Sequence, residues 1–337
     1  MIIRTTAKPR SQSTTSIRLP RALGDFALAS DGLSSLGLTH SHTTRLAPGK
    51  GRLDHVQISL AYSVDADDAF MFHALTSGAV DTCGLTFTHR RGDTAWLNAL
   101  AEAGEADVVA ISAGAYPRAA DKYLLLPHGA SVGRGFGPVV VAKRPMRLAD
   151  LAGRRVAIPG FSTTAYLVLR LIEPAVVPVV VPIAPFTRVF EALDRGEVDA
   201  ALLIHEGRLI YDRRGCVAVA ELGEWWLGET GLPLPLGVNV IRRGLGAEVI
   251  ARVSAVLRTS IGYAIDHRDD VIRMLSREPR GEASLSETAL LDRYLAMYAN
   301  QDTLAMASDV RAGIDALFAR AENAGLLPAG CRVEWAP

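Results

Sequence analysis

The chain has 337 residues, which is enough for about two domains or for one large α/β unit with a sizeable core. Its 36 Lys and Arg residues balance 36 Asp and Glu residues, so no overall charge favours nucleic acid or an anionic membrane as a partner. Hydrophobic residues make up 49% of the chain, and no stretch approaches the roughly 18 uninterrupted apolar residues of a membrane helix. We therefore expect a globular protein with no nucleic-acid partner and no stable membrane association.

The three cysteines, Cys83, Cys216 and Cys331, are odd in number, widely spaced and form no C-x-x-C pair. This pattern predicts neither a disulfide framework nor a zinc site. A reducing compartment is the simpler interpretation, so we predict a cytoplasmic location and no bound metal.

The first 54 residues differ in composition from the rest of the chain. They hold 14 Ser and Thr and eight Lys and Arg residues against three acidic ones, with little apolar periodicity. No secretory signal is predicted, because the apolar run from Asp25 to Leu38 is interrupted by Asp31 and Gly32. We predict that residues 1–54 are a disordered or leader extension, and both a transit peptide and a translation start assigned too far upstream fit this pattern.

From residue 54 onward, apolar β-branched runs alternate with polar loops and helical spacing. Strands are predicted at residues 56–62, 107–111, 155–158 and 198–204. The last part of the chain is predicted to form amphipathic helices at residues 249–265, 285–297 and 310–321. Strands that alternate with helices indicate an α/β protein with mostly parallel sheets, in which ligands bind beyond the carboxyl ends of the strands.

Several chemically useful side chains fall at these predicted strand ends. Ser63, Ser112 and His205 each follow a strand directly, and Thr163 and Thr164 follow the turn at residues 159–160. Hydroxyl groups at the first turn of a helix either cap the helix or help to bind a carboxylate or phosphate, and both interpretations stay open. His205 is either a structural histidine or a general base, since imidazole titrates near neutral pH.

Two glycine-rich segments carry no cofactor motif. Residues 129–138 do not have the G-x-G-x-x-G spacing and run into a predicted strand, so they indicate a close-packed crossing of the backbone. Residues 223–237, rich in Trp and Pro, are either an aromatic cover over the core or a stacking surface for a ligand. No nucleophile elbow, P-loop or redox motif is present, and we predict no cofactor.

Residues 56–328 resemble the menaquinone-biosynthesis proteins of the futalosine route, the group that joins 1,4-dihydroxy-6-naphthoate synthase to chorismate dehydratase and to solute-binding proteins. The match is spread along the chain and is most specific to the synthase branch. The segments that carry it are residues 129–138, 158–166, 204–208, 222–226 and 231–237.

The resemblance implies an α/β, two-lobed fold similar to that of type II periplasmic binding proteins, in which each lobe is a mostly parallel sheet flanked by helices. It places residues 55–142 and 245–328 in lobe 1 and residues 143–244 in lobe 2. The ligand cleft is then expected between the two lobes.

The resemblance also implies a cofactor-independent carbon–carbon lyase that converts cyclic dehypoxanthine futalosine to 1,4-dihydroxy-6-naphthoate. His205 matches the general base proposed for the family, and Ser112, Thr163 and Thr164 match positions near the bound carboxylate. With Ser63 of the first loop, they form the predicted site for a small anionic substrate.

One loop departs from the family pattern. The family has Ser-Pro-Cys-Pro-Asn-Asp-Thr-Phe where this chain has Ser63-Val64-Asp65-Ala66-Asp67-Asp68-Ala69-Phe70. The carboxylate of Asp67 in place of an amide is expected to repel an anionic ligand or to require a cationic partner such as an arginine. Two alternatives therefore stay open, a non-catalytic protein that binds a small carboxylate and a chorismate-dehydratase-like enzyme. The sequence does not predict the oligomeric state.

Overall fold

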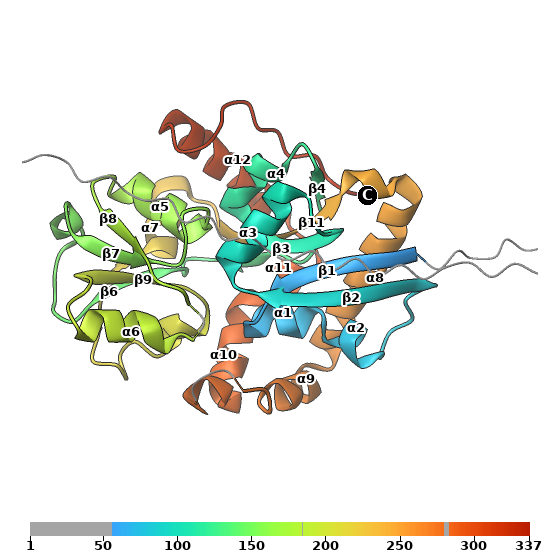
Figure 1. The fold of residues 1–337 in the computed structure, drawn as a ribbon, viewed down its shortest axis with the longest axis horizontal. Helices are drawn as coiled ribbons and strands as arrows, with labels where there is room; N and C mark the ends of the chain where they lie inside the picture. Colours follow the sequence, from blue (N-terminus) through green and yellow to red (C-terminus); the bar gives the residue numbers. More distant parts are fainter. Residues whose placement is uncertain (1–55, 184, 280–282) are drawn as a thin grey trace, which may run out of the picture. The chain divides into compact units, whose positions relative to one another are not determined.

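The structure is a computed structural model, and it describes residues 56–183, 185–279 and 283–337 (Figure 1). The predicted extension at residues 1–54 lies outside these residues. Within them, strands and helices form an α/β arrangement around two separate mixed sheets. The predicted fold class is confirmed at this level, and none of the described helices is long and apolar enough to cross a membrane.

The first sheet has the strand order β2-β1-β3-β11-β4, with β5 also paired to β11. The strands β1 and β3 run parallel to each other, and so do β1 and β2, whereas β11 is antiparallel to its neighbours. These strands are β1 (Val56–Ser63), β2 (Leu85–Gly92), β3 (Val108–Ser112), β4 (Tyr123–Leu125), β5 (Ser131–Gly133) and β11 (Leu234–Arg242).

Helices cover both faces of this sheet (Figure 1), because successive apolar side chains of its strands point to opposite faces. On one face, Ile58 and Leu60 of β1 pack with residues of α2 and α8. On the other face, Val109 and Ile111 of β3 pack with residues of α3, α4 and α12. The helices are α2 (His73–Ser77), α3 (Thr94–Ala103), α4 (Tyr116–Ala119), α8 (Ala247–Asp266) and α12 (Ser308–Asn323).

The second sheet has the strand order β10-β6-β9-β7-β8. The strand β7 is parallel to β8 and β9, whereas β6 is antiparallel to β9 and β10. Its strands are β6 (Val139–Ala142), β7 (Arg155–Ile158), β8 (Val177–Val180), β9 (Ala200–Leu203) and β10 (Val217–Glu221). The helix α6 (Thr187–Asp194) lies on one side of this sheet and α5 (Thr164–Ile172) and α7 (Leu222–Thr230) on the other (Figure 1).

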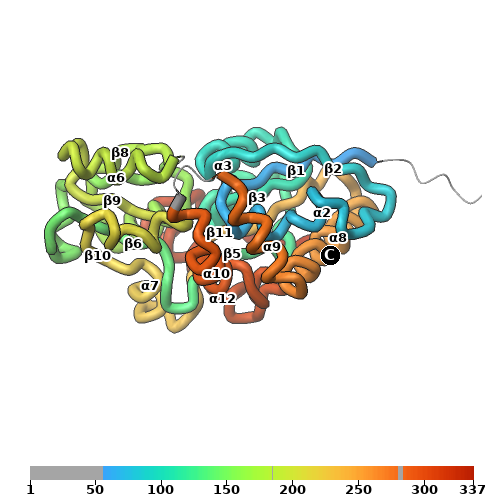
Figure 2. The backbone as a smooth tube through the Cα atoms, turned by 90° about the horizontal axis from the view of Figure 1, so that it is seen from below, coloured from blue at the N-terminus to red at the C-terminus, as the bar shows by residue number. Residues whose placement is uncertain are grey.

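The remaining helices connect the sheets to the site. The helix α10 (Thr288–Tyr298) contacts α1 (Ala66–Met71), β5 and the short 3-10 helix η3 (His205–Leu209). It contacts α9 (Arg268–Leu275), which lies near it in Figure 2, and it precedes α11 (Gln301–Leu304) in the chain. The three amphipathic helices predicted near the C-terminal end correspond to α8, α10 and α12.

The sheets differ from the sequence predictions in two respects. Each sheet is mixed. In the first sheet β11 is antiparallel to its neighbour β3, and in the second sheet β6 is antiparallel to its neighbour β9. In addition, β6 belongs to the second sheet and β11 to the first, although the predicted boundaries at residues 142 and 245 put them in the opposite lobes. The division of the chain into two lobes stays a prediction. The sheets to which β6 and β11 belong favour boundaries near residues 138 and 233.

Candidate active site

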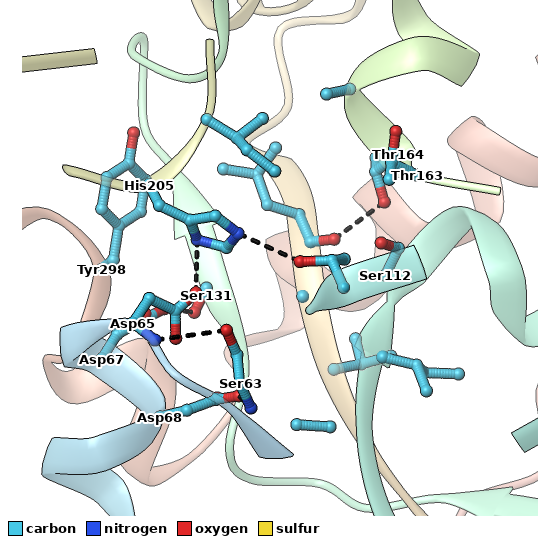
Figure 3. Close-up of a pocket in the computed structure, with 18 of the residues that line it drawn as sticks. Ser63, Asp65, Asp67, Asp68, Ser112, Ser131, Thr163, Thr164, His205 and Tyr298 are labelled. Atoms are coloured by element: carbon cyan, nitrogen blue, oxygen red, sulfur yellow. Dashed lines mark hydrogen bonds and ion pairs between the residues drawn. The ribbon is translucent and has the colours of Figure 1, made fainter. Parts of the chain in front are cut away.

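A cavity lies where strands of both sheets end (Figure 3). Its volume is about 100 Å³. All five residues predicted from the sequence line this cavity, namely Ser63, Ser112, Thr163, Thr164 and His205. The structure thus brings them together, whereas their roles stay predictions.

The loop after β1 is held by short hydrogen bonds. The backbone N–H of Ser63 donates to Oδ2 of Asp68 at 2.7 Å, and the N–H of Asp65 donates to Oγ of Ser63 at 3.3 Å. The N–H of Ala66 donates to Oε1 of Glu206 at 2.9 Å, which joins this loop to η3. The chain turns into α1 at Ala66, and the side chains of Asp65, Asp67 and Asp68 are buried.

His205 occupies an unusual backbone conformation between β9 and η3. Its φ angle is +52°, in the left-handed region that a residue with a side chain adopts at a cost of about 1 to 3 kcal/mol. The preceding residue, Ile204, is extended, and the chain turns sharply into η3. This turn places the imidazole ring on the cavity wall, where backbone strain of this kind is often found.

Both ring nitrogens of His205 have partners. Nδ1 forms an ion pair with the carboxylate of Asp65 and lies 3.5 Å from the hydroxyl of Tyr294. Nε2 lies 3.1 Å from Oγ1 of Thr94, which also lines the cavity. A carboxylate on Nδ1 fixes the orientation of the ring and favours the proton on that nitrogen, so Nε2 is directed to the cavity side (Figure 3).

The ion pair changes the proton affinity of both groups. Burial lowers the pKa of His205, but the charge and hydrogen bond of Asp65 outweigh burial and raise this pKa to about 9. Burial raises the pKa of Asp65, and the charge of His205 more than offsets it, so the pKa of Asp65 lies below its usual value. At neutral pH the free protein therefore holds an imidazolium next to a carboxylate.

Asp67 has a different environment, although it is equally buried. Its Oδ2 accepts a hydrogen bond from Oγ of Ser131 at 2.5 Å, and its Oδ1 accepts one from the hydroxyl of Tyr294 at 3.0 Å. Burial and the nearby charge of Asp65 raise the pKa of Asp67 to about 7. Burial also raises the pKa of Asp68 well above its usual value. At neutral pH the carboxyl groups of Asp67 and Asp68 are therefore partly or fully protonated, and the loop does not carry three negative charges.

The cationic group beside the acidic loop is His205. Arg208, a nearby guanidinium that also lines the cavity, donates to both carboxylate oxygens of Glu221, at 3.1 and 2.9 Å. Asp67, which was expected to repel an anion or to require a cationic partner, accepts hydrogen bonds from Ser131 and Tyr294, and the imidazolium of His205 pairs with Asp65 instead. Asp65, Asp67 and His205 have ligand atoms within 4.8 Å of one another, a group that could hold a metal ion.

The predicted hydroxyl residues make different contacts. Oγ1 of Thr163 accepts a hydrogen bond from the N–H of Tyr166 at 3.2 Å and caps α5. Oγ1 of Thr164 donates to the carbonyl of Leu236 at 2.8 Å and accepts from the N–H of Gly114 at 3.0 Å. The cap interpretation therefore holds for Thr163, and Thr164 connects α5 to the strand β11.

Ser112 is held from the side by a buried amide. Its N–H donates to Oδ1 of Asn98 at 2.9 Å, and its Oγ accepts from Nδ2 of Asn98 at 3.2 Å. The same Nδ2 also donates to Ser162, which ties α3 to the turn before α5. With its oxygen accepting from Asn98, the Ser112 hydroxyl can direct its proton to a ligand.

Four further residues of the cavity were missed by the sequence analysis. Asp65 could have been found from the sequence, because it stands where the family loop has Cys. Thr94, Tyr294 and Asn239 could not have been found in this way, because they belong to a helix start, a C-terminal helix and a strand interior that only the fold brings to the cavity.

The sequence profile of a family described as menaquinone biosynthesis matches residues 58–323. The chain belongs to this family. Two relatives named 1,4-dihydroxy-6-naphtoate synthase are similar to it along most of its length. The protein of Streptomyces coelicolor is 37% identical over 278 residues, covering 81% of this chain and 95% of the relative. The protein of Thermus thermophilus is 36% identical over 269 residues, covering 80% of this chain and 95% of the relative.

Two solved structures are similar to this chain. A crystal structure of an Archaeoglobus fulgidus protein has a TM-score of 0.74 at 42% identity and covers 80% of this chain and 98% of that one. An alkanesulfonate-binding protein of Xanthomonas axonopodis has a TM-score of 0.58 at 16% identity, covering 81% and 94%. The latter likeness concerns the fold alone, and it confirms the predicted similarity to periplasmic binding proteins.

Proposed function

We propose that the chain is an enzyme of menaquinone biosynthesis that converts cyclic dehypoxanthine futalosine to 1,4-dihydroxy-6-naphthoate without a cofactor, as a carbon–carbon lyase. Two relatives named for this synthase support the proposal, since they align with about four fifths of the chain. The observation that carries it is the paired imidazole of His205 on the wall of a cavity that hydroxyl side chains also line.

In this proposal His205 is the general base. Its neutral form accepts a proton from the substrate at Nε2, which starts the breakdown of the sugar-derived ring, and Asp65 stabilises the imidazolium that forms. Because the pKa of His205 is raised to about 9, only a small fraction of the free enzyme holds the neutral form at pH 7. The rate of the chemical step should then rise with pH up to about 9.

The substrate carboxylate is proposed to lie on the side of the cavity away from the acidic loop. Ser112 offers a hydroxyl proton there, and the first turn of α5 at Thr163 and Thr164 offers the positive end of a nine-residue helix. Ser63, beside the imidazolium of His205, completes the proposed substrate-binding set. The loop carboxyl groups of Asp67 and Asp68 oppose an anion less when they are protonated.

The experiment is to incubate the purified full chain separately with cyclic dehypoxanthine futalosine and with chorismate, and to follow products by liquid chromatography and mass spectrometry. The proposal expects 1,4-dihydroxy-6-naphthoate from the first substrate and no turnover of the second. Turnover of chorismate would favour the dehydratase-like alternative. Tight binding without any turnover would favour a binding protein. The cytoplasmic location and the two-lobed division also stay proposals.

A further inference from the structure

One buried side chain on the cavity wall lacks partners. Asn239, in the middle of β11, is 0% exposed and lines the cavity. Neither Nδ2 nor Oδ1 of its amide forms a hydrogen bond with any residue that the structure describes. Buried side-chain amides are normally satisfied, so an amide with both its donor and its acceptor unused is a specific feature to explain.

Two close neighbours of Asn239 form no hydrogen bond with its amide. Across the sheet it pairs with Ala110, which offers only a methyl group. On the other side it packs against Gly129, where an added Cβ would come within 2.0 Å of the amide nitrogen. Gly129 also has a φ angle of +80°, so glycine is favoured there both by conformation and by space. The fold thus makes room for the amide without satisfying it.

Another buried asparagine shows the contrast. Asn98 is also 0% exposed, but its Oδ1 accepts from Ser112, and its Nδ2 donates to Ser112 and Ser162. Its amide is explained by the protein alone. An apolar residue of similar shape at position 239 would avoid the cost of burying an unpaired amide, so the free protein gains nothing from asparagine there.

We propose that Asn239 contacts the substrate and binds one of its uncharged polar groups, a hydroxyl or a carbonyl. The chemistry follows from the surroundings, since an amide both donates and accepts a hydrogen bond. Ser131 pairs with Gly237, two residues before Asn239 on the same strand, and donates its hydroxyl proton to Asp67. The substrate carboxylate is already assigned to Ser112 and the first turn of α5, so an uncharged polar group of the substrate is left for Asn239. This inference rests on the proposed function for the identity of the substrate.

The test compares Asn239→Leu with the matched control Asn98→Leu, by thermal unfolding without ligand and by calorimetric titration with cyclic dehypoxanthine futalosine. Asn239→Leu is expected to raise Tm by about 2 to 4 °C, because it removes an unpaired buried amide, and to weaken substrate binding by about 10- to 100-fold. Asn98→Leu is expected to lower Tm, because it leaves the partners of its amide unsatisfied. Gly129→Ala, which crowds the Asn239 amide, should also weaken binding.

Two results would overturn the inference. One is a Tm of Asn239→Leu that falls as it does for Asn98→Leu, which would show that the protein itself satisfies the amide. The other is substrate binding as tight as in the unsubstituted chain. If the unsubstituted chain does not bind this substrate at all, the proposed function fails, and the sign of the Tm change still decides whether Asn239 is unpaired in the free protein.

Discussion

The carboxylate of Asp65 and Nδ1 of His205 form an ion pair that joins the loop after β1 in the first sheet to the turn after β9 in the second. The two residues are far apart in the sequence, and only His205 stands in a segment that the family resemblance connects with catalysis. Their pairing gives the cavity an oriented imidazole with a raised pKa. It also explains how an acidic loop can border a site for a carboxylate, because the imidazolium of His205 pairs with this loop.

Asp65→Asn should change the pH dependence of catalysis. Without the charge of Asp65, the pKa of His205 falls from about 9 toward its ordinary value of about 6.5, so the rise of kcat/KM with pH should shift to lower pH. The plateau should be about 10- to 100-fold lower, because a charge-assisted hydrogen bond to the imidazolium is lost. Measurement of kcat/KM between pH 5.5 and 10 checks both, with the exposed Asp121→Asn as a control that should change neither. An unshifted profile would separate Asp65 from the titration of the base.

Asp67→Asn should stabilise the protein more as the pH rises. The pKa of Asp67 is about 7 in the folded protein, against an ordinary value of 3.8 in the unfolded chain. Between pH 3.8 and about pH 7 the folded protein therefore binds a proton that the unfolded chain does not. The contribution of Asp67 to the free energy of unfolding therefore falls as the pH rises through this window. Relative to the unsubstituted chain, Tm of the variant should be similar near pH 4 and clearly higher at pH 8.

The control for this measurement is Asp309→Asn. The hydrogen bonds of Arg134 lower the pKa of Asp309, so its carboxylate adds stability that is present above pH 3.8 and lost as the pH falls. This variant should be slightly less stable than the unsubstituted chain at pH 8, opposite in sign to Asp67→Asn. The same sign for both would refute a buried, proton-holding Asp67.

Ser112→Ala tests the proposed binding of the substrate carboxylate. A hydrogen bond to a charged group contributes about 1.5 to 3 kcal/mol, so loss of the hydroxyl should raise KM by about 10- to 100-fold and change kcat little. The exposed Ser77→Ala, at the end of α2, serves as the control for expression and assay. An unchanged KM would remove Ser112 from the substrate-binding set.

The position of the site followed from the sequence where strands end in polar residues. Ser63, Ser112 and His205 were predicted to lie near a ligand because each follows a strand, and the structure brings together the ends of β1 and β3 in the first sheet and of β9 in the second. The strand β11 was not predicted, because Pro233 and Pro235 suggested a loop. The structure accommodates Pro235 at a register shift in the pairing with β5, where the strand tolerates a residue without an N–H donor.

The electrostatics of the site could not be predicted in the same way. The raised pKa of Asp67 depends on burial and on the charge of Asp65. The environment that buries Asp67 includes Tyr294, a residue 227 positions away that reaches it through the packing of α10 against α1. The left-handed φ of His205 and the unpaired amide of Asn239 likewise arise from the fold around them. Propensity and spacing report local structure, and these properties come from contacts between distant segments.

The most direct test of the account is the turnover of cyclic dehypoxanthine futalosine by His205→Ala at pH 9, with substrate affinity measured separately by calorimetry. The account predicts that 1,4-dihydroxy-6-naphthoate forms about 10² to 10⁴ times more slowly, which is the usual effect of losing a positioned general base, while binding is largely retained. Product formation at the rate of the unsubstituted chain would contradict the assignment of His205 as the base.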